Sequence, residues 1–141
     1  MSRYRSKTAA TWIAATLGAL GLHRFYLRGR NDIVGWLHPL PTTIGLVGVW
    51  RMRSFGVDDN LGGVLVLVLG LMISYAMLCA IVYGLTPDER WDRRHNPGAP
   101  VHATGWGAVL GVVAALMVGG AVLMGTLAFA GQKFFEWQLG A

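Results

Sequence analysis

The chain has 141 residues, of which 54% are hydrophobic and 13% are charged, against about 25% charged residues in soluble domains. This composition excludes an ordinary soluble domain and is typical of an integral membrane protein. Twelve Lys and Arg against seven Asp and Glu give a net charge of +5. The basic residues are scattered between apolar runs, which argues against nucleic-acid binding and favours contact with anionic lipid headgroups.

Four apolar runs approach the length of about 20 residues that a spanning helix needs. They cover residues 8–22, 33–50, 61–85 and 103–130. The first is short and follows basic residues, as in a secretory signal, but no small-x-small cleavage site follows it, so we expect it to be retained. The sequence predicts an all-α integral membrane protein with four transmembrane helices, arranged as two helical hairpins over residues 7–60 and 61–141.

The first apolar run leads directly into a basic, aromatic turn. The turn contains His23, Arg24, Phe25, Tyr26, Arg28 and Arg30. Arginine at this depth can reach lipid phosphates, and aromatic rings favour the interface, so the turn is a candidate contact for anionic headgroups. Alternatively, these side chains hold the hairpin together through bonds to helix-end groups. In that case Arg24 bonds a carbonyl or a carboxylate, of which Asp32 is the nearest, and Phe25 packs against the spans.

The second apolar run contains His38, Pro39 and Pro41 near its middle. Proline removes a backbone donor and clashes with the preceding turn, so we expect the helix to kink or break here. The freed carbonyls need partners in lipid, which neighbouring helices, the hydroxyl of Thr42 or Thr43, or a trapped water can supply. The kink is explained by packing alone, or it provides a polar notch in which His38 titrates or contacts a ligand.

The loop between the third and fourth runs predicts a short interfacial helix over residues 87–95. Residues 86–89 (TPDE) have the pattern of a capping box with proline at the first helical position. Residues 96–98 (NPG) end the helix, and we expect Trp91 to dip into the membrane interface. The aromatic residues of the segment 132–141 indicate an interfacial tail.

Small residues recur every four positions in the predicted spans, which lets helix backbones approach closely. The clearest ridge is Gly107, Gly111, Ala115 and Gly119, and Gly18 ends a similar ridge in the first run. Packing within the bundle explains these ridges. The alternative is that the ridge of Gly107 and Gly111 faces a second copy of the chain or another membrane protein.

The first sixty residues contain a further pattern. It consists of Lys7, the stretch LGALGLHRFYL at 17–27, Gly29, Arg30, Gly35 and the stretch GLVGVW at 45–50. In this pattern residues 7–60 resemble the TM2 domain family, which implies two transmembrane helices joined by a short turn and no settled biochemical activity. The chain departs from the family at Arg28, which intervenes before Gly29, and at Ser54, where the family often has aspartate.

No catalytic motif is present: the sequence lacks Gly-x-Ser-x-Gly, a phosphate-binding glycine loop and His-Glu-x-x-His. The four histidines are too dispersed for a metal cluster, and the single Cys79 forms no internal disulfide. We therefore predict a non-enzymatic scaffold or interaction protein without cofactor or metal, whose partners are the bilayer and its anionic headgroups. The alternative is a small transporter or channel component that uses the kink at His38.

With four spans, the basic residues divide evenly between the two sides of the membrane. Six fall on the side of the N-terminus (Arg3, Arg5, Lys7, Arg51, Arg53, Lys133) and six on the other (Arg24, Arg28, Arg30, Arg90, Arg93, Arg94). The positive-inside rule therefore does not choose an orientation. The basic cluster at the start of the chain favours a cytoplasmic N-terminus in the cell (inner) membrane.

Overall fold

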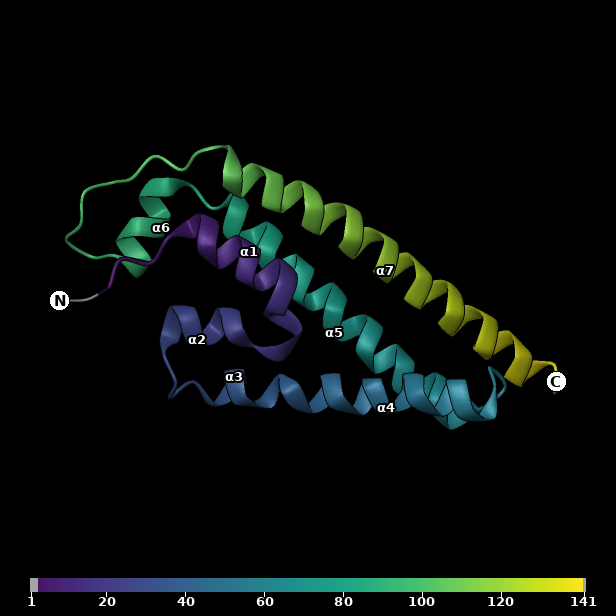
Figure 1. Cartoon of the computed structure of the whole chain (residues 1–141). Coiled ribbons are helices and arrows are strands. Elements are labelled where there is room, and N and C mark those ends of the chain that lie inside the picture. Colours follow the sequence, from purple (N-terminus) through teal and green to yellow (C-terminus); the bar gives the residue numbers. More distant parts are fainter. Residues whose placement is uncertain (1–2, 141) are drawn as a thin grey trace.

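The computed structural model describes residues 3–140, which form helices and no strand. About 80% of the chain is helical, so the all-α prediction is confirmed. In chain order the elements are α1 (Lys7–Leu17), the 3-10 helix η1 (Gly18–Leu20), α2 (Leu22–Arg28), α3 (Ile33–Leu37), α4 (Pro39–Phe55), α5 (Asn60–Leu85), α6 (Asp88–His95) and α7 (Trp106–Gln138) (Figure 1).

Three helical segments in the described part of the chain are long and apolar enough to cross a membrane. They are Ile33–Phe55, which joins α3 and α4, Asn60–Leu85 and Trp106–Gln138. The expectation of four spans is not confirmed, because the first apolar run does not form one long helix. Helix α1 has 11 residues and is therefore about 16 Å long, roughly half of a hydrocarbon core of about 30 Å.

The first apolar run instead folds back on itself. After α1 the chain tightens into η1, and Gly21 adopts φ 80° and ψ 6°, a left-handed conformation that glycine accepts without steric cost. The chain then returns as α2, so both ends of this α1–α2 hairpin lie at the same end of the bundle (Figure 1). The predicted pair of spanning helical hairpins is replaced by this short hairpin and three long segments.

Helix α5 is the central element of the bundle. It packs against α4 on one side and α7 on the other, and α1 contacts both α5 and α7. The N-terminal segment, the α2–α3 turn, α6 and the loop before α7 gather at one end, which we call the N-terminal face (Figure 1). The α4–α5 turn and the C-terminus lie at the other end, which we call the opposite face.

The predicted small-residue ridge on α7 packs inside the molecule. Gly107 and Gly111 face α1, and Gly119 faces α5. At Gly18, an added Cβ would lie 2.8 Å from the Cβ of Ala76, so α5 approaches the first hairpin closely. These glycines are therefore occupied by neighbouring helices of the same chain and do not offer a face to a second subunit.

The second span is interrupted at His38, between α3 and α4 and just before Pro39. Side chains compensate for the interruption. Nδ1 of His38 lies 2.7 Å from the carbonyl oxygen of Val34, and the hydroxyl of Thr42 donates to the carbonyl oxygens of Ala19 and His38. Side chains thus supply partners to the carbonyls of Val34, Ala19 and His38 near the break, which suits the interior of a membrane.

Candidate functional site: an arginine pocket at the N-terminal face

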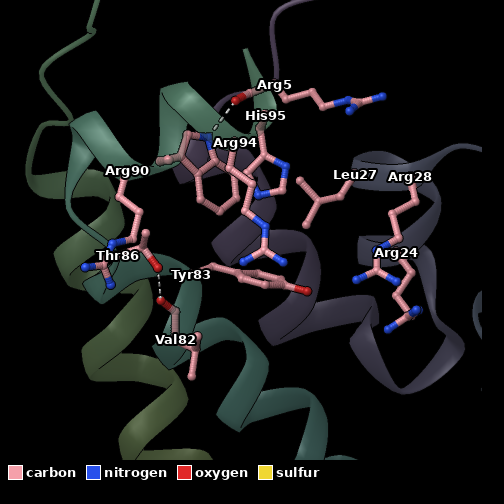
Figure 2. A pocket seen from close by; sticks show the side chains of 11 residues that line it. Arg5, Arg24, Leu27, Arg28, Val82, Tyr83, Thr86, Arg90, Arg94 and His95 are labelled. Atoms are coloured by element: carbon pink, nitrogen blue, oxygen red, sulfur yellow. Dashed lines mark hydrogen bonds between the residues drawn. The ribbon is translucent and has the colours of Figure 1, made fainter. Parts of the chain in front are cut away.

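A cavity of about 640 Å³ opens at the N-terminal face between α2, the end of α5 and α6 (Figure 2). It is lined by Arg5, Arg24, Leu27, Arg28, Val82, Tyr83, Thr86, Arg90, Trp91, Arg94 and His95. Five arginines and no acidic residue line it, and we call it the arginine pocket. Its volume falls within the range of about 300–1,000 Å³ that is typical of small-ligand sites.

Two short helices supply four of the five arginines. Arg24 and Arg28 are four residues apart on α2, and Arg90 and Arg94 are four residues apart on α6. Because residues at i and i+4 share one face of a helix, each helix presents a pair of guanidinium groups to the cavity. Figure 2 shows Arg94 reaching from α6 toward Tyr83, with Arg90 to one side and the α2 pair to the other.

The floor of the pocket is apolar and well packed. Trp91 is 2% exposed and Leu27 5%, and both contact Tyr83 or its neighbours in one buried cluster. The indole Nε1 of Trp91 donates to the carbonyl oxygen of Arg5 at 2.8 Å. The prediction that Trp91 dips into the membrane interface is therefore wrong: this ring is buried against the protein, where it docks α6.

Polar contacts fix α6 to the rest of the N-terminal face. The ammonium group of Lys7 donates to the carbonyl oxygen of Thr86 and to the carboxylate of Asp88. Thr104 donates its backbone N–H and its hydroxyl to the same carboxylate. These bonds, above all the one from Lys7, lower the pKa of Asp88 to about 2. Lys7 is only 8% exposed and the Asp88 side chain is 29% exposed, so this pair, which we call the Lys7–Asp88 clasp, is shielded from water mainly on the lysine side.

The predicted capping box before α6 is absent. Helix α6 begins at Asp88 behind Pro87, and no side chain caps it. The hydroxyl of Thr86 donates instead to the carbonyl oxygen of Val82 at 2.6 Å, so it satisfies a carbonyl in the last turn of α5 and does not cap α6. The capping box did not form because Pro87, which has no side-chain acceptor, occupies the N-cap position, and the Thr86 hydroxyl is already bonded to α5. A helix is nonetheless present over Asp88–His95.

Three residues of the predicted turn have structural partners. Arg24 donates to both carboxylate oxygens of Asp32, at 2.6 and 3.3 Å, which lowers the pKa of Asp32, so the expected bond to a carboxylate is confirmed. Phe25 packs against Trp36 at the start of the second span, with ring centroids 5.1 Å apart. The hydroxyl of Tyr26 accepts a bond from the backbone of the N-terminal segment at 2.8 Å.

The other pocket arginines have no acidic partner. Among residues 3–140, arginine forms ion pairs only in Arg24–Asp32 and Arg51–Asp59. The guanidinium groups of four pocket residues are therefore uncompensated: Arg5, Arg28, Arg90 and Arg94. Clustered, unpaired positive charge in a concave site attracts anions, and arginine forms paired hydrogen bonds with carboxylate and phosphate.

The comparison with known families concerns the N-terminal part of this arrangement. Residues 3–56 match the TM2 domain family. This TM2 segment comprises the N-terminal segment, the α1–α2 hairpin and the first span, and it supplies Arg5, Arg24 and Arg28 to the pocket. Helices α5 and α6, which supply the other wall, lie outside the match. No curated protein and no solved structure matches the chain.

The match and the three long apolar helices identify a membrane protein with a TM2 segment, as the sequence predicted. The resemblance implied two transmembrane helices in this segment. The structure contains one candidate span there, Ile33–Phe55, preceded by the α1–α2 hairpin. The turn residues of the TM2 segment therefore lie beside the chain's own N-terminal segment, where they share one pocket.

The TM2 segment also brings two histidines together in the interior. His23 is fully buried and His38 is 5% exposed, and their ring centroids are 5.5 Å apart. Within the described residues, neither ring nitrogen of His23 nor Nε2 of His38 has a hydrogen-bond partner. Tyr83 and Tyr75 of α5 flank this histidine pair. Because His23 is fully buried, it is not a headgroup contact. Gly21 makes the pair possible, since a Cβ at this position would meet Gly35 and His38.

Sequence reasoning found only part of the pocket. It singled out Arg24, Arg28 and Arg30, but the side chain of Arg30 does not line the cavity. It missed Arg90 and Arg94, which it counted in the charge balance across the membrane and not as site residues. The spacing of four residues in both arginine pairs was the available signal, but nothing in the sequence showed that the two helices face each other.

Proposed function

We propose that this protein is a non-enzymatic membrane interaction module that holds an anionic lipid headgroup in the arginine pocket. The observation that carries this proposal is the set of four unpaired guanidinium groups above an apolar floor. Arginine suits phosphate because its planar fork matches the phosphate oxygens. No group in the pocket is arranged as a nucleophile beside a general base, so binding explains the site better than catalysis does.

The position of the pocket favours a lipid over a soluble anion. The pocket lies at the end of α5, a candidate span, and includes Val82, which is 54% exposed. Leu85 at the end of the same helix is 67% exposed. Apolar surface of this kind on a membrane-spanning helix faces hydrocarbon. A lipid can therefore place its phosphate among the arginines while its chains lie along α5.

We further infer that the N-terminal face is cytoplasmic. Because the α1–α2 hairpin returns to its starting side, the basic residues no longer divide evenly. Nine gather at the N-terminal face (Arg3, Arg5, Lys7, Arg24, Arg28, Arg30, Arg90, Arg93, Arg94) and three at the opposite face (Arg51, Arg53, Lys133). The positive-inside rule then favours a cytoplasmic N-terminus, in the leaflet where anionic lipids create a negative surface potential.

Cysteine labelling tests this orientation. In a Cys79→Ala background, we expect a membrane-impermeant thiol reagent to label Val57→Cys from outside intact cells. Ala99→Cys, on the N-terminal face, is expected to react only after permeabilisation, as is an N-terminal tag with its antibody. Both positions are exposed, so access depends on the side of the membrane. Labelling of Ala99→Cys in intact cells would show that the N-terminal face is outside the cell, the reverse of the inferred orientation.

Headgroup binding is tested by removing charge from the pocket. Each basic residue near an anionic surface contributes about 1 kcal/mol, so the triple variant Arg28→Gln, Arg90→Gln, Arg94→Gln is expected to bind phosphatidylglycerol on the order of 100-fold more weakly. The measurement is the lipid concentration that gives half of the maximal thermal stabilisation in detergent, with phosphatidylcholine as the uncharged reference.

The matched control removes the same charge elsewhere. Arg30, Arg53 and Arg93 are exposed and do not line the pocket, so their triple Gln variant should retain most of the affinity. An equal loss in both triple variants would show diffuse electrostatic attraction in place of a pocket.

A second candidate function, a small transporter or channel component, is favoured by the histidine pair at the interrupted second span. Its unpartnered ring nitrogens are costly in a membrane interior, where such residues often mark a pathway. Single cysteines at residues 34–43 in the Cys79→Ala background test this function. Labelling by the impermeant reagent along one helix face supports a water-filled path to His38, and labelling restricted to the ends of the span excludes it.

A further inference from the structure

The charge of the arginine pocket narrows the class of headgroup that fits it. Four guanidinium groups have no acidic partner, and the fifth, on Arg24, is shared with Asp32. A phosphodiester headgroup such as phosphatidylglycerol carries one negative charge and would leave most of these cations in mutual repulsion. A ligand with two or more negative charges compensates them more fully in a partly enclosed site, where charges interact more strongly than in water.

The same lining excludes headgroups that carry a cation. Choline, ethanolamine and serine headgroups each add a quaternary or primary ammonium to the phosphate. A carboxylate or an aromatic cage would be needed to receive it. No acidic residue lines the pocket, and the Trp91 ring is 2% exposed and packed against Tyr83 and His95, so these rings form no open cage. The ammonium would instead lie among Arg28, Arg90 and Arg94. The chemistry of the site therefore favours a phosphate group that ends the molecule.

The geometry fits a phosphate with several free oxygens. The arginine pairs project from two different helices, α2 and α6 (Figure 2), and Arg5 of the N-terminal segment also lines the cavity. A phosphomonoester has three unsubstituted oxygens and a diphosphate has more, so either offers more acceptors to the arginines of these two walls than a phosphodiester does. Tyr83 lies between these walls, and Figure 2 shows its hydroxyl directed toward the α2 side.

We propose that the arginine pocket selects a lipid whose headgroup is a terminal phosphomonoester or diphosphate, with its hydrocarbon chains leaving past Val82. This inference rests on the proposed function and specifies its ligand. The exposed Val82 side chain opens the lining toward the hydrocarbon, which distinguishes the ligand from a free inorganic phosphate or diphosphate. The cavity volume of about 640 Å³ accommodates two phosphate groups or one phosphate with the adjoining glycerol.

The test compares phosphatidic acid with phosphatidylglycerol on the full-length protein in detergent, by thermal stabilisation. At pH 8 we expect phosphatidic acid to bind about five- to tenfold more tightly, because it carries an additional charge. A phosphomonoester loses its second charge below a pH of about 6, so this preference is expected to shrink at pH 5. Inorganic pyrophosphate, which lacks the hydrocarbon chains, is expected to stabilise the protein less than phosphatidic acid.

Each outcome separates this inference from the proposed function. Equal binding of phosphatidic acid and phosphatidylglycerol at pH 8 overturns the inference and leaves headgroup binding intact. If neither lipid stabilises the protein more than phosphatidylcholine does, both proposals are overturned. If pyrophosphate stabilises it as much as phosphatidic acid does, the claim that the ligand is a lipid is overturned. The double variant Arg28→Gln, Arg94→Gln, with one change in each wall, is expected to abolish the preference, whereas Arg30→Gln, Arg93→Gln should keep it.

Discussion

Replacing Lys7 by methionine is expected to lower the free energy of unfolding by about 3 kcal/mol, the lower end of the loss for breaking a buried ion pair, because the Asp88 side chain is 29% exposed. Lys7 is 8% exposed, and its ammonium group binds both the Thr86 carbonyl and the Asp88 carboxylate. Its removal leaves a partly buried carboxylate that retains only the bonds from Thr104. The measurement is unfolding of the purified protein in detergent, by melting temperature and by denaturant titration.

Two variants serve as controls for the Lys7–Asp88 clasp. Lys7→Met combined with Asp88→Asn removes both charges and should recover part of the loss, because no unpaired carboxylate remains. Lys133→Met removes a lysine that pairs with Glu136, whose side chain is 38% exposed, three residues later on the same helix, and should change stability less than Lys7→Met does. A similar loss of stability for Lys133→Met and Lys7→Met would show that the Lys7–Asp88 clasp contributes no more than an ordinary surface ion pair.

The clasp also has a defined pH dependence. The pKa of Asp88 is lowered from 3.8 to about 2 in the folded protein, so its contribution is fully present above pH 4 and is lost as the pH falls toward 2. The stability difference between the wild type and Asp88→Asn should therefore be constant from pH 7 to pH 5 and decrease between pH 4 and pH 2. A difference that persists unchanged at the lowest pH would contradict this assignment.

Gly21→Ala is expected to destabilise the protein by about 2–5 kcal/mol, the sum of left-handed strain and overpacking. Gly21 has φ 80°, and an added Cβ would lie 2.5 Å from the carbonyl oxygen of Gly35 and 2.9 Å from the Cβ of His38. A backbone oxygen cannot move aside as a flexible side chain can, so the α1–α2 hairpin must separate from the second span. Thermal unfolding in detergent measures the loss.

Gly98→Ala is the matched control for Gly21→Ala. Gly98 has φ 84° and no heavy atom within 4 Å of an added Cβ, so it is subject only to the conformational strain of about 1–2 kcal/mol. The difference between the two variants therefore reports the packing of the hairpin against the second span. Equal losses would mean that this contact contributes nothing measurable.

The sequence predicted those parts of the fold that depend on local composition. The runs at 33–50, 61–85 and 103–130 became Ile33–Phe55, Asn60–Leu85 and Trp106–Gln138, because uninterrupted apolar residues favour helices in any arrangement. The C-terminal aromatic segment was assigned to a tail, but α7 continues through it to Gln138. No proline and no glycine lies between Gln132 and Gln138, so α7 continues beyond the apolar run.

The first run could not be read in the same way. Its composition is that of a short span, and its fold depends on Gly21, which has a left-handed conformation and lies so close to Gly35 and His38 that no side chain fits there. A glycine in an apolar run also fits a close helix contact, so the sequence does not distinguish a packing position from a reversal. For the same reason the sequence did not predict the arginine pocket, because α2 and α6 line one cavity only after the chain folds back.

Local motifs were reliable only where their partners were also local. The pair Arg24–Asp32 was anticipated because eight residues and one turn separate its members. The capping pattern before α6 failed because Thr86 bonds to Val82 and Pro87 takes the N-cap position. The Lys7–Asp88 pair joins residues 81 positions apart, and a single sequence does not record such a contact.

The fold-back of the α1–α2 hairpin gives the bundle a different cross-section along its length. The half next to the N-terminal face contains α1, α2 and three long helical segments, whereas the opposite half contains the long segments alone (Figure 1). In a bilayer, a body of this shape displaces more lipid from one leaflet than from the other. The protein is therefore a wedge, and it should prefer membrane whose curvature relieves the crowding in the leaflet around its broad end.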